Sequence, residues 1–248
     1  MQSSTSGFVL KLARVKENDL IVNIFTQDYG VRAYYLKNVG VAKSKRRPLI
    51  EILNFLKFTS HERNTGLAYI EDMKLLSDFE LLKNPANMFA ESFILAELLL
   101  KFLAEEVKYE LLWNILASYN ALGLDYKKQA LLSKYLLIHY SLQLLQDLGF
   151  LPELDFDHQT GEKLDPGKPI LALRDEPGYI QVNSDIGEAE VVQGIKVQKY
   201  FLAHPLEIEK VLQLQLTPEL ANYLLKLQLQ WHEAVLEREL QSKFLLKL

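Results

Sequence analysis

The sequence contains no cysteine among its 248 residues. Disulfide bonds and thiolate metal sites are therefore excluded. It also lacks a long hydrophobic run, because the most apolar segment, residues 93–104, is interrupted by Glu97 and Lys101 and is too short to cross a bilayer. The first ten residues, MQSSTSGFVL, do not follow the pattern of a secretory signal peptide. We therefore expect a cytoplasmic protein without a membrane partner.

Signatures of catalysis and of nucleotide binding are missing as well. There is no phosphate-binding loop, no glycine-rich dinucleotide motif and no nucleophile elbow. The histidines, at positions 61, 139, 158, 204 and 232, have no metal-ligand spacing. Asp155, Asp157 and Asp165 offer oxygen ligands for a hard metal ion, although the turn residues around them favour a solvated loop. The pattern favours a binder without cofactor or metal, and a metal-dependent nuclease remains the enzymatic alternative.

What the sequence does contain is typical of a globular protein. Hydrophobic residues make up 49% of the chain and charged residues 24%, which excludes a disordered chain. The length suits one large domain or two smaller ones.

Residues 7–76 follow the pattern of short strands. Runs rich in Val, Ile, Leu, Phe and Tyr cover residues 7–14, 20–26, 30–37, 49–58 and 66–76, and polar turn sequences separate them. In the first run Phe8, Leu10 and Leu12 recur at every second position, which is the period of a strand. Five short strands predict a small barrel of the oligonucleotide-binding (OB) class, which we place at residues 1–80.

From about residue 81 the apolar residues follow helical spacing instead. We expect helices over residues 88–107, 110–122, 126–148, 197–203, 205–213 and 218–235, with a short closing helix. Residues 150–195 lose this period, and a hairpin is expected around residues 176–178. The fold class is therefore α+β, with a helical domain at residues 81–248 that carries a small irregular or β insert at about 150–195.

The clearest functional signal is a basic loop, VAKSKRRPL, at residues 41–49. Residues 1–63 carry a net charge of +6, whereas the whole chain carries −4. Because a polyanion responds to the local field, this excess predicts phosphate contacts. The loop contributes Lys43, Lys45, Arg46 and Arg47, and the supporting cations are Lys11, Arg14, Lys16, Arg32, Lys37 and Lys57. The alternative is an ordinary solvated loop.

Three tyrosines near these cations have two interpretations. Tyr29, Tyr34 and Tyr35 can stack on unpaired bases if they lie on the outer surface of the barrel. At strand spacing alternate side chains point inward, so some of the rings can belong to the core instead.

The order of these features resembles the bacterial recombination mediator family RecO. The resemblance rests on an apolar first strand, a turn into glycine, a basic third strand and loop, and two helical segments. In this sequence these are residues 8–12, Phe25, Thr26, Gly30, Lys37, residues 43–47, Phe55, LLQDLGFL at 144–151 and ELQSKFL at 239–245.

The resemblance implies a role in DNA repair within the bacterial cytoplasm, at the nucleoid. Such a protein would bind single- and double-stranded DNA, anneal complementary strands and engage the acidic C-terminal tail of single-stranded DNA-binding protein (SSB). With its partner RecR it would help to load the recombinase RecA on coated strands. Candidate contacts for the acidic tail are Lys127, Lys128, Lys134 and His139, since the arginine that the family often has in this helix is absent.

The insert departs from the family pattern. Many members of the family carry a cysteine zinc site there, whereas this chain has Asp157, Thr160 and Gly161 in the matching positions. The resemblance therefore predicts an insert without metal that is held by packing. A function of another class also fits the residues: a non-catalytic protein–protein adaptor, in which the barrel is structural and the helices bind a partner.

Overall fold

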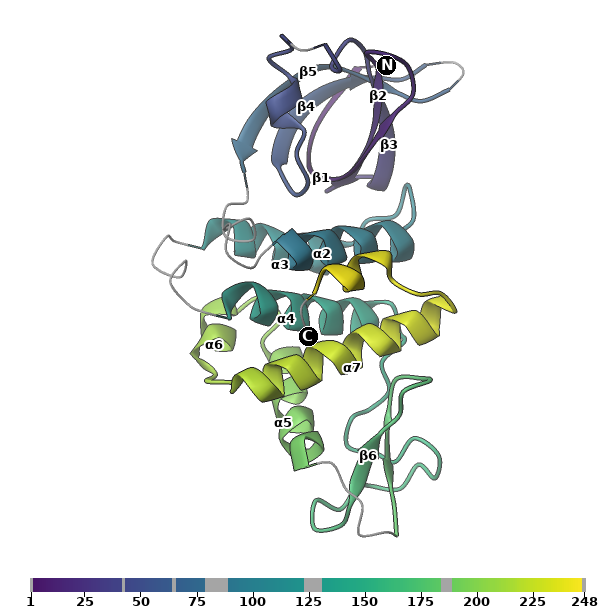
Figure 1. Cartoon of the computed structure of the whole chain (residues 1–248), viewed down its shortest axis with the longest axis vertical. Coiled ribbons are helices and arrows are strands. Elements are labelled where there is room, and N and C mark those ends of the chain that lie inside the picture. Colours follow the sequence, from purple (N-terminus) through teal and green to yellow (C-terminus); the bar gives the residue numbers. More distant parts are fainter. Residues whose placement is uncertain are drawn as a thin grey trace. The chain divides into compact units, whose positions relative to one another are not determined.

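The structure is a computed structural model (Figure 1) that describes residues 2–41, 43–63, 66–78, 89–122, 131–183 and 189–246. The chain forms two compact units, Met1–Trp113 and Asn114–Leu248. Helix α3 (Glu110–Ala121) contains the division between them. The domain boundary predicted after residue 80 lies outside the described residues.

The first unit contains a closed five-stranded barrel, as the sequence predicted. Its strands follow the order β1-β2-β3-β5-β4, and β4 pairs with β1 to close the barrel. A bulge between Val9 and Lys11 lets β1 pair with β4 through its first half and with β2 through its second. The strands are β1 (Gln2–Arg14), β2 (Leu20–Thr26), β3 (Gly30–Leu36), β4 (Phe55–His61) and β5 (Tyr69–Ser77).

The largest differences from the predicted strands are at the starts of β1 and β4. Strand β1 begins at Gln2 because the polar residues 2–6 pair with β4, although they lack the apolar alternation of a strand. The predicted strand over residues 49–58 begins only at Phe55. Before it, η1 (Arg47–Leu49) is a 3-10 helix, and Leu53 adopts a left-handed backbone with φ 62°. The Asn54 side chain donates to the Leu49 carbonyl at 2.8 Å and fixes this turn.

An aromatic cluster joins the barrel to the segment that follows it within the first unit. The ring of Trp113 lies 5.2 Å from Phe8, 5.6 Å from Phe25 and 5.8 Å from Phe55, between centroids. Phe8, Phe25 and Trp113 are buried and Phe55 is half-buried, and helix α2 (Phe89–Phe102) packs against β1. This outer part of the barrel therefore packs against the protein's own chain.

Gly30 permits a close backbone contact at the β2–β3 turn. The Glu106 amide donates to the Tyr29 carbonyl at 2.8 Å, and the Val31 amide donates to the Ala104 carbonyl at 3.4 Å. Gly30 has φ +62°, and a Cβ atom there would lie 2.6 Å from the Val107 carbonyl oxygen. A side chain cannot fit without moving one of the two backbones.

The second unit is mainly helical. Almost every side chain of α4 is buried, so this helix is a central element, and α5, α6 and α7 all contact it (Figure 1). Its elements after α3 are α4 (Leu132–Asp147), β6 (Ile170–Ala172), β7 (Tyr179–Gln181), α5 (Ala189–Ala203), α6 (Ile208–Gln213), α7 (Pro218–Leu236) and η3 (Gln241–Leu245).

Helix α5 is longer than predicted, and the first residues of the third predicted helix lie outside the described residues. The prediction placed the start of α5 at residue 197 because the sequence over residues 150–195 lacks a clear helical period. In the structure a Cβ atom at Gly194 would lie 3.1 Å from Leu224 of α7. Glycine is thus used for close helix packing.

The insert forms the predicted hairpin, β6 paired with β7, and packs on the helices of its own unit. Trp231 donates through Nε1 to the Leu173 carbonyl at 2.8 Å, and the Tyr179 hydroxyl bonds Gln198 at 2.6 Å. The carboxylate of Asp157 accepts three backbone N–H groups, from Gln159, Thr160 and Gln181, at 2.9, 2.8 and 2.6 Å. Despite burial, which raises it, these bonds hold the pKa of Asp157 below its usual value.

Two histidines are fully buried in the second unit. His139 on α4 bonds the Tyr119 hydroxyl through Nδ1 at 2.6 Å, and His232 on α7 bonds the Gln228 carbonyl at 2.7 Å. Burial lowers the pKa of each imidazole to about 4. Both side chains are therefore neutral at neutral pH.

We expect Gly30→Ala to lower the stability of the first unit by about 1–3 kcal/mol, because the added methyl group overpacks the contact with residues 104–107. Gly66→Ala is the matched control, since Gly66 also has a positive φ, +83°, but nothing lies within 4 Å of its Cβ position. Denaturant unfolding followed by Trp113 fluorescence measures both variants. Equal losses would show that backbone strain alone matters and that the close contact does not.

The second unit should lose stability as the pH falls from 6.5 toward 4. In that window the unfolded chain protonates both histidines, whereas the folded chain keeps His139 and His232 neutral. Each histidine then lowers the free energy of unfolding by up to about 1.4 kcal/mol for each pH unit. Urea unfolding at several pH values measures the slope. The double variant His139→Gln, His232→Gln should have a flatter slope whatever its stability at neutral pH, and an unchanged slope would contradict the assignment.

Candidate functional site

The turn between β1 and β2 is tied to the end of β3 at one end of the barrel. The carboxylate of Asp19 accepts the Asn38 amide at 2.9 Å and the Tyr35 hydroxyl. The Gly40 amide donates to the Asn18 carbonyl at 2.8 Å. The hydrogen bond from Tyr35 holds the pKa of Asp19 below its usual value, so the carboxylate stays charged. These bonds bring Lys16 in the turn and Lys37 after β3 to the same end.

The basic loop and the end of β1 meet at a shared hollow. Arg14 and Arg47 line a cavity of about 310 Å³ together with Leu12, Leu20 and Gly40. Both arginines are exposed to solvent, as are Lys43 and Lys45 in the loop. The structure therefore gathers cations that are more than thirty positions apart in the sequence.

Eight of the ten predicted phosphate contacts are exposed, and within the described residues none of the eight forms an ion pair with a carboxylate. Three of them lie on the strands: Lys11 and Arg14 on β1, and Lys57 on β4, where Lys57 pairs in register with Lys74 of β5. Two adjacent lysines repel one another, so this part of the sheet favours an external anion. The eight are Lys11, Arg14, Lys16, Lys37, Lys43, Lys45, Arg47 and Lys57.

Arg32 and Arg46 differ from the other eight, which corrects the sequence interpretation. Arg32 is held by Glu62 at 2.7 Å and by Glu105 at 2.9 Å, and its side chain is only 14% exposed. Arg46 donates to the Ile70 carbonyl of β5 at 2.9 Å, and burial lowers its pKa. Arg32 is therefore neutralised by the protein's own carboxylates, whereas Arg46 is half-buried and held by a backbone carbonyl.

The three tyrosines fall into different environments. Tyr34 is fully buried in the barrel, with its ring 5.0 Å from Phe58, so the core interpretation holds there. Tyr29 is half-buried beside Arg32, 5.5 Å from its guanidinium carbon. Tyr35 lies on the outer face and is half-buried, because β3 places alternate residues outside.

The sequence interpretation missed three residues next to Tyr35. Tyr69 of β5 is its register partner, and His61 stacks on Tyr69 with centroids 5.0 Å apart. The guanidinium carbon of Arg63 lies 5.2 Å from the ring of Tyr35 and 5.1 Å from the ring of Tyr69. The pairing of β5 with β3 on one side and with β4 on the other brings these residues together, and no spacing in the sequence signals it.

The residues predicted to bind a partner's acidic tail are not gathered in the described part of the second unit. Lys134 donates to the side-chain oxygen of Asn222, whereas His139 is fully buried and neutral. A buried, neutral imidazole cannot contact a partner, so His139 is removed from the predicted set. Lys127 and Lys128 lie outside the described residues.

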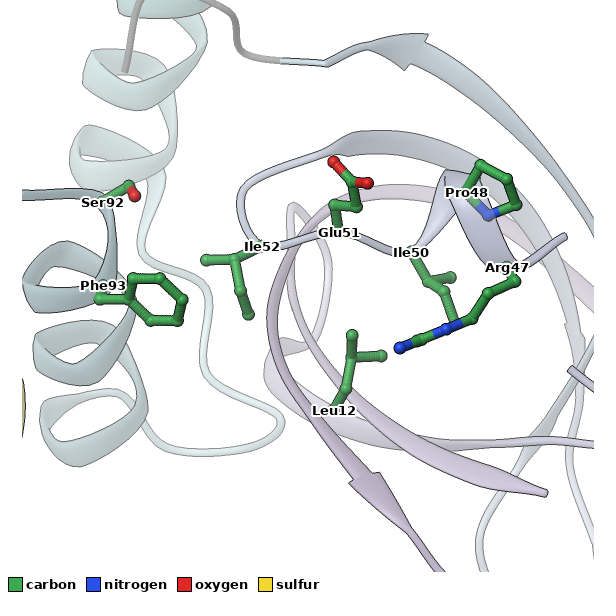
Figure 2. Close-up of a pocket in the computed structure, with 8 residues that line it drawn as sticks. All are labelled: Leu12, Arg47, Pro48, Ile50, Glu51, Ile52, Ser92 and Phe93. Atoms are coloured by element: carbon green, nitrogen blue, oxygen red, sulfur yellow. The ribbon is translucent and has the colours of Figure 1, made fainter. Parts of the chain in front are cut away.

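An apolar pocket opens beside the basic loop, within the first unit. Its volume is about 600 Å³, which is in the range of ligand-binding pockets. Figure 2 shows Ile52 and Phe93 facing one another near Leu12, with the side chain of Arg47 extending toward Leu12. Phe93 of α2 is 41% exposed, a high value for a large apolar ring. The rest of the lining is Pro48, Ile50, Glu51 and Ser92.

The three aspartates of the nuclease alternative have separate roles. Asp155 pairs with Lys199 at 2.7 Å, Asp157 accepts backbone amides, and Asp165 accepts the Gly167 amide at 2.9 Å. Over the described ranges no cluster of three or more His, Cys, Asp or Glu side chains is suited to a metal ion. Among the helices of those same ranges, none combines the length and the apolar character that spanning a bilayer requires.

Comparison with known proteins gives one family match. Residues 1–79 match the family model described as Recombination protein O N terminal. This match confirms the resemblance inferred from the sequence, and its bounds include every cation of the basic end.

Several proteins with similar sequences are named DNA repair protein RecO. The protein is 27% identical to the DNA repair protein RecO of Caldanaerobacter subterraneus subsp. tengcongensis, over 64% of this chain and 63% of that one. It is 29% identical to the DNA repair protein RecO of Streptococcus pneumoniae strain R6, over 66% and 64%. It is 32% identical to that of Polynucleobacter necessarius subsp. necessarius, over 60% of each chain. The match thus spans less than two thirds of the length of each of these relatives.

Proposed function

Because the chain carries the amino-terminal domain of the RecO family, we propose that it is a non-catalytic, DNA-binding recombination mediator that acts in DNA repair. The observation that carries this proposal is the group of eight exposed cations without a carboxylate partner in the described part of the barrel unit. Such side chains neutralise phosphates at little cost, since no internal ion pair must first be broken.

The proposed activity is the annealing of complementary strands. Annealing needs a surface that holds two phosphate backbones and leaves their base edges free to pair. Contacts from lysine and arginine to phosphates meet this requirement, because they position a strand without reading its sequence. Single- and double-stranded DNA are therefore the proposed ligands, and the nucleoid in the cytoplasm is the proposed location.

In this proposal the other partners are the acidic C-terminal tail of SSB, RecR and, indirectly, the RecA filament. The pocket of Figure 2 supports a place for the tail. An acidic and aromatic peptide needs apolar walls with a cation at the rim, and Ile52, Phe93 and Arg47 supply these. Lys134, which the sequence suggested as a contact for the tail, already donates a hydrogen bond to Asn222.

The first test is fluorescence anisotropy with a labelled single-stranded oligonucleotide over a salt series. The triple variant Lys43→Ala, Lys45→Ala, Arg47→Ala should bind more weakly at low salt. Its plot of log K against log salt should be flatter by about 2, since each lost phosphate contact on a single strand removes about 0.7. Annealing of complementary oligonucleotides should slow in parallel.

The matched control changes three exposed lysines of the second unit, Lys168→Ala, Lys196→Ala and Lys226→Ala. This variant loses the same net charge but should keep the affinity and the slope of the original protein. If both triple variants weaken DNA binding equally, affinity depends on the net charge of the protein and not on the basic loop. An absence of DNA binding at low salt would instead favour the protein–protein adaptor.

The tail proposal is tested with a labelled peptide that has several acidic residues and a terminal phenylalanine. Phe93→Ala should weaken peptide binding about fivefold or more, because the ring forms a wall of the pocket. It should leave binding of single-stranded DNA unchanged. Lys134→Ala is the control: if it weakens peptide binding and Phe93→Ala does not, the tail binds to the helical unit instead.

A further inference from the structure

The group formed by Tyr35, Tyr69, His61 and Arg63, which we call the ring platform, is not explained by phosphate contacts. Tyr35 and Tyr69 are register partners on β3 and β5, and the Tyr35 amide donates to the Ala68 carbonyl at 2.8 Å. His61 lies parallel to Tyr69, with an interplanar angle of 12°. All three rings are half-buried, so each keeps an accessible surface.

The platform is rigid at its edges. The Tyr35 hydroxyl is bound to the carboxylate of Asp19, and this bond raises the pKa of the phenol, which therefore stays neutral. His61 Nε2 lies 2.7 Å from a carboxylate oxygen of Glu71. These bonds fix the edges of Tyr35 and His61, and the half-buried rings keep accessible surface for stacking.

Arg63 is the cationic partner of the platform. It is exposed, it contacts both tyrosine rings, and the described residues provide no carboxylate for it. Arg32, in contrast, touches Tyr29 and Tyr34 but is fixed by two carboxylates. Only the weak attraction of a cation for an aromatic face, roughly two- to fivefold in affinity at an exposed site, holds Arg63 in place.

The platform lies beside the basic loop. Arg46 of that loop donates to the carbonyl of Ile70, the residue after Tyr69, and Asp19 ties Tyr35 to Asn38 at the start of the segment leading to the loop. A strand whose phosphates contact the loop can therefore reach the rings with a neighbouring base. Stacking of one base on an aromatic side chain strengthens binding roughly 5- to 150-fold, which exceeds the attraction that holds Arg63.

We propose that the ring platform is a stacking site for one unpaired base, and that Arg63 covers it in the absence of DNA. A base entering the site displaces Arg63 from the rings into solvent. A paired base in a duplex is already stacked on its neighbours, so the site selects single strands. This inference rests on the proposed DNA-binding function, because it requires that phosphates first engage the loop.

The experiment compares two labelled probes of equal length with the full chain, an oligothymidylate and an oligomer with an abasic residue at every position. Both probes carry the same phosphates, so the ratio of their dissociation constants reports base stacking alone. The unchanged protein should bind the thymidine probe at least about fivefold more tightly. Both probes should show the same salt slope.

Tyr69→Ala should bring this ratio close to one by weakening only the thymidine probe, with the salt slope unchanged. Tyr69→Phe should keep the ratio, because it keeps the ring. Arg63→Ala should leave the salt slope of both probes unchanged and raise the ratio, because the rings are then uncovered. Tyr223→Ala is the matched control, since Tyr223 also lies under an arginine, Arg174 at 5.8 Å, but in the second unit.

The outcomes separate the two proposals. If neither probe binds, the DNA-binding function and the stacking site both fail. If both probes bind with a steep salt slope but equally well, phosphate binding stands and the stacking site is refuted. A ratio that survives in Tyr69→Ala, or that falls equally in Tyr223→Ala, would also overturn the stacking site.

Discussion

Asp19 is the residue on which the arrangement of the basic end depends. Its carboxylate receives the Asn38 amide and the Tyr35 hydroxyl, so one buried group fixes the β1–β2 turn against the end of β3. A carboxylate bound in this way resists protonation and keeps both bonds at neutral pH. Lys16, Lys37 and the basic loop therefore share one end of the barrel, and Tyr35 keeps its ring face outward.

The barrel packs against the protein's own chain on the side that carries Phe8 and Phe55. Trp113 covers these rings, and the turn at Gly30 accepts the backbone of residues 104–106 so closely that only glycine fits. The same segment supplies Glu105, which helps to neutralise Arg32. The segment that packs on this side of the barrel therefore also neutralises Arg32. The cations without a carboxylate partner among the described residues lie at the basic end and on the uncovered strands.

The described residues of the insert in the second unit are held by hydrogen bonds and apolar burial. A zinc ion would fix the turn through several strong ligands. Here one carboxylate, Asp157, binds three backbone amides and links the turn at residues 159–160 to β7. Tyr179 and Trp231 then pack the hairpin on α5 and α7. Hydrogen bonds and apolar burial provide the constraint that metal coordination would otherwise impose.

The sequence by itself determined the fold class, because the strand period over residues 7–76 and the helical spacing after them depend only on local patterns, and it located the basic loop. It did not determine which cations are free to contact a phosphate. Arg32, for example, is paired with Glu62 and Glu105, which are distant from it in the chain. It could not reveal the pairing of Tyr35 with Tyr69 or the burial of His139 either. Register and packing bring distant residues into contact, and such contacts are decided only when the chain folds.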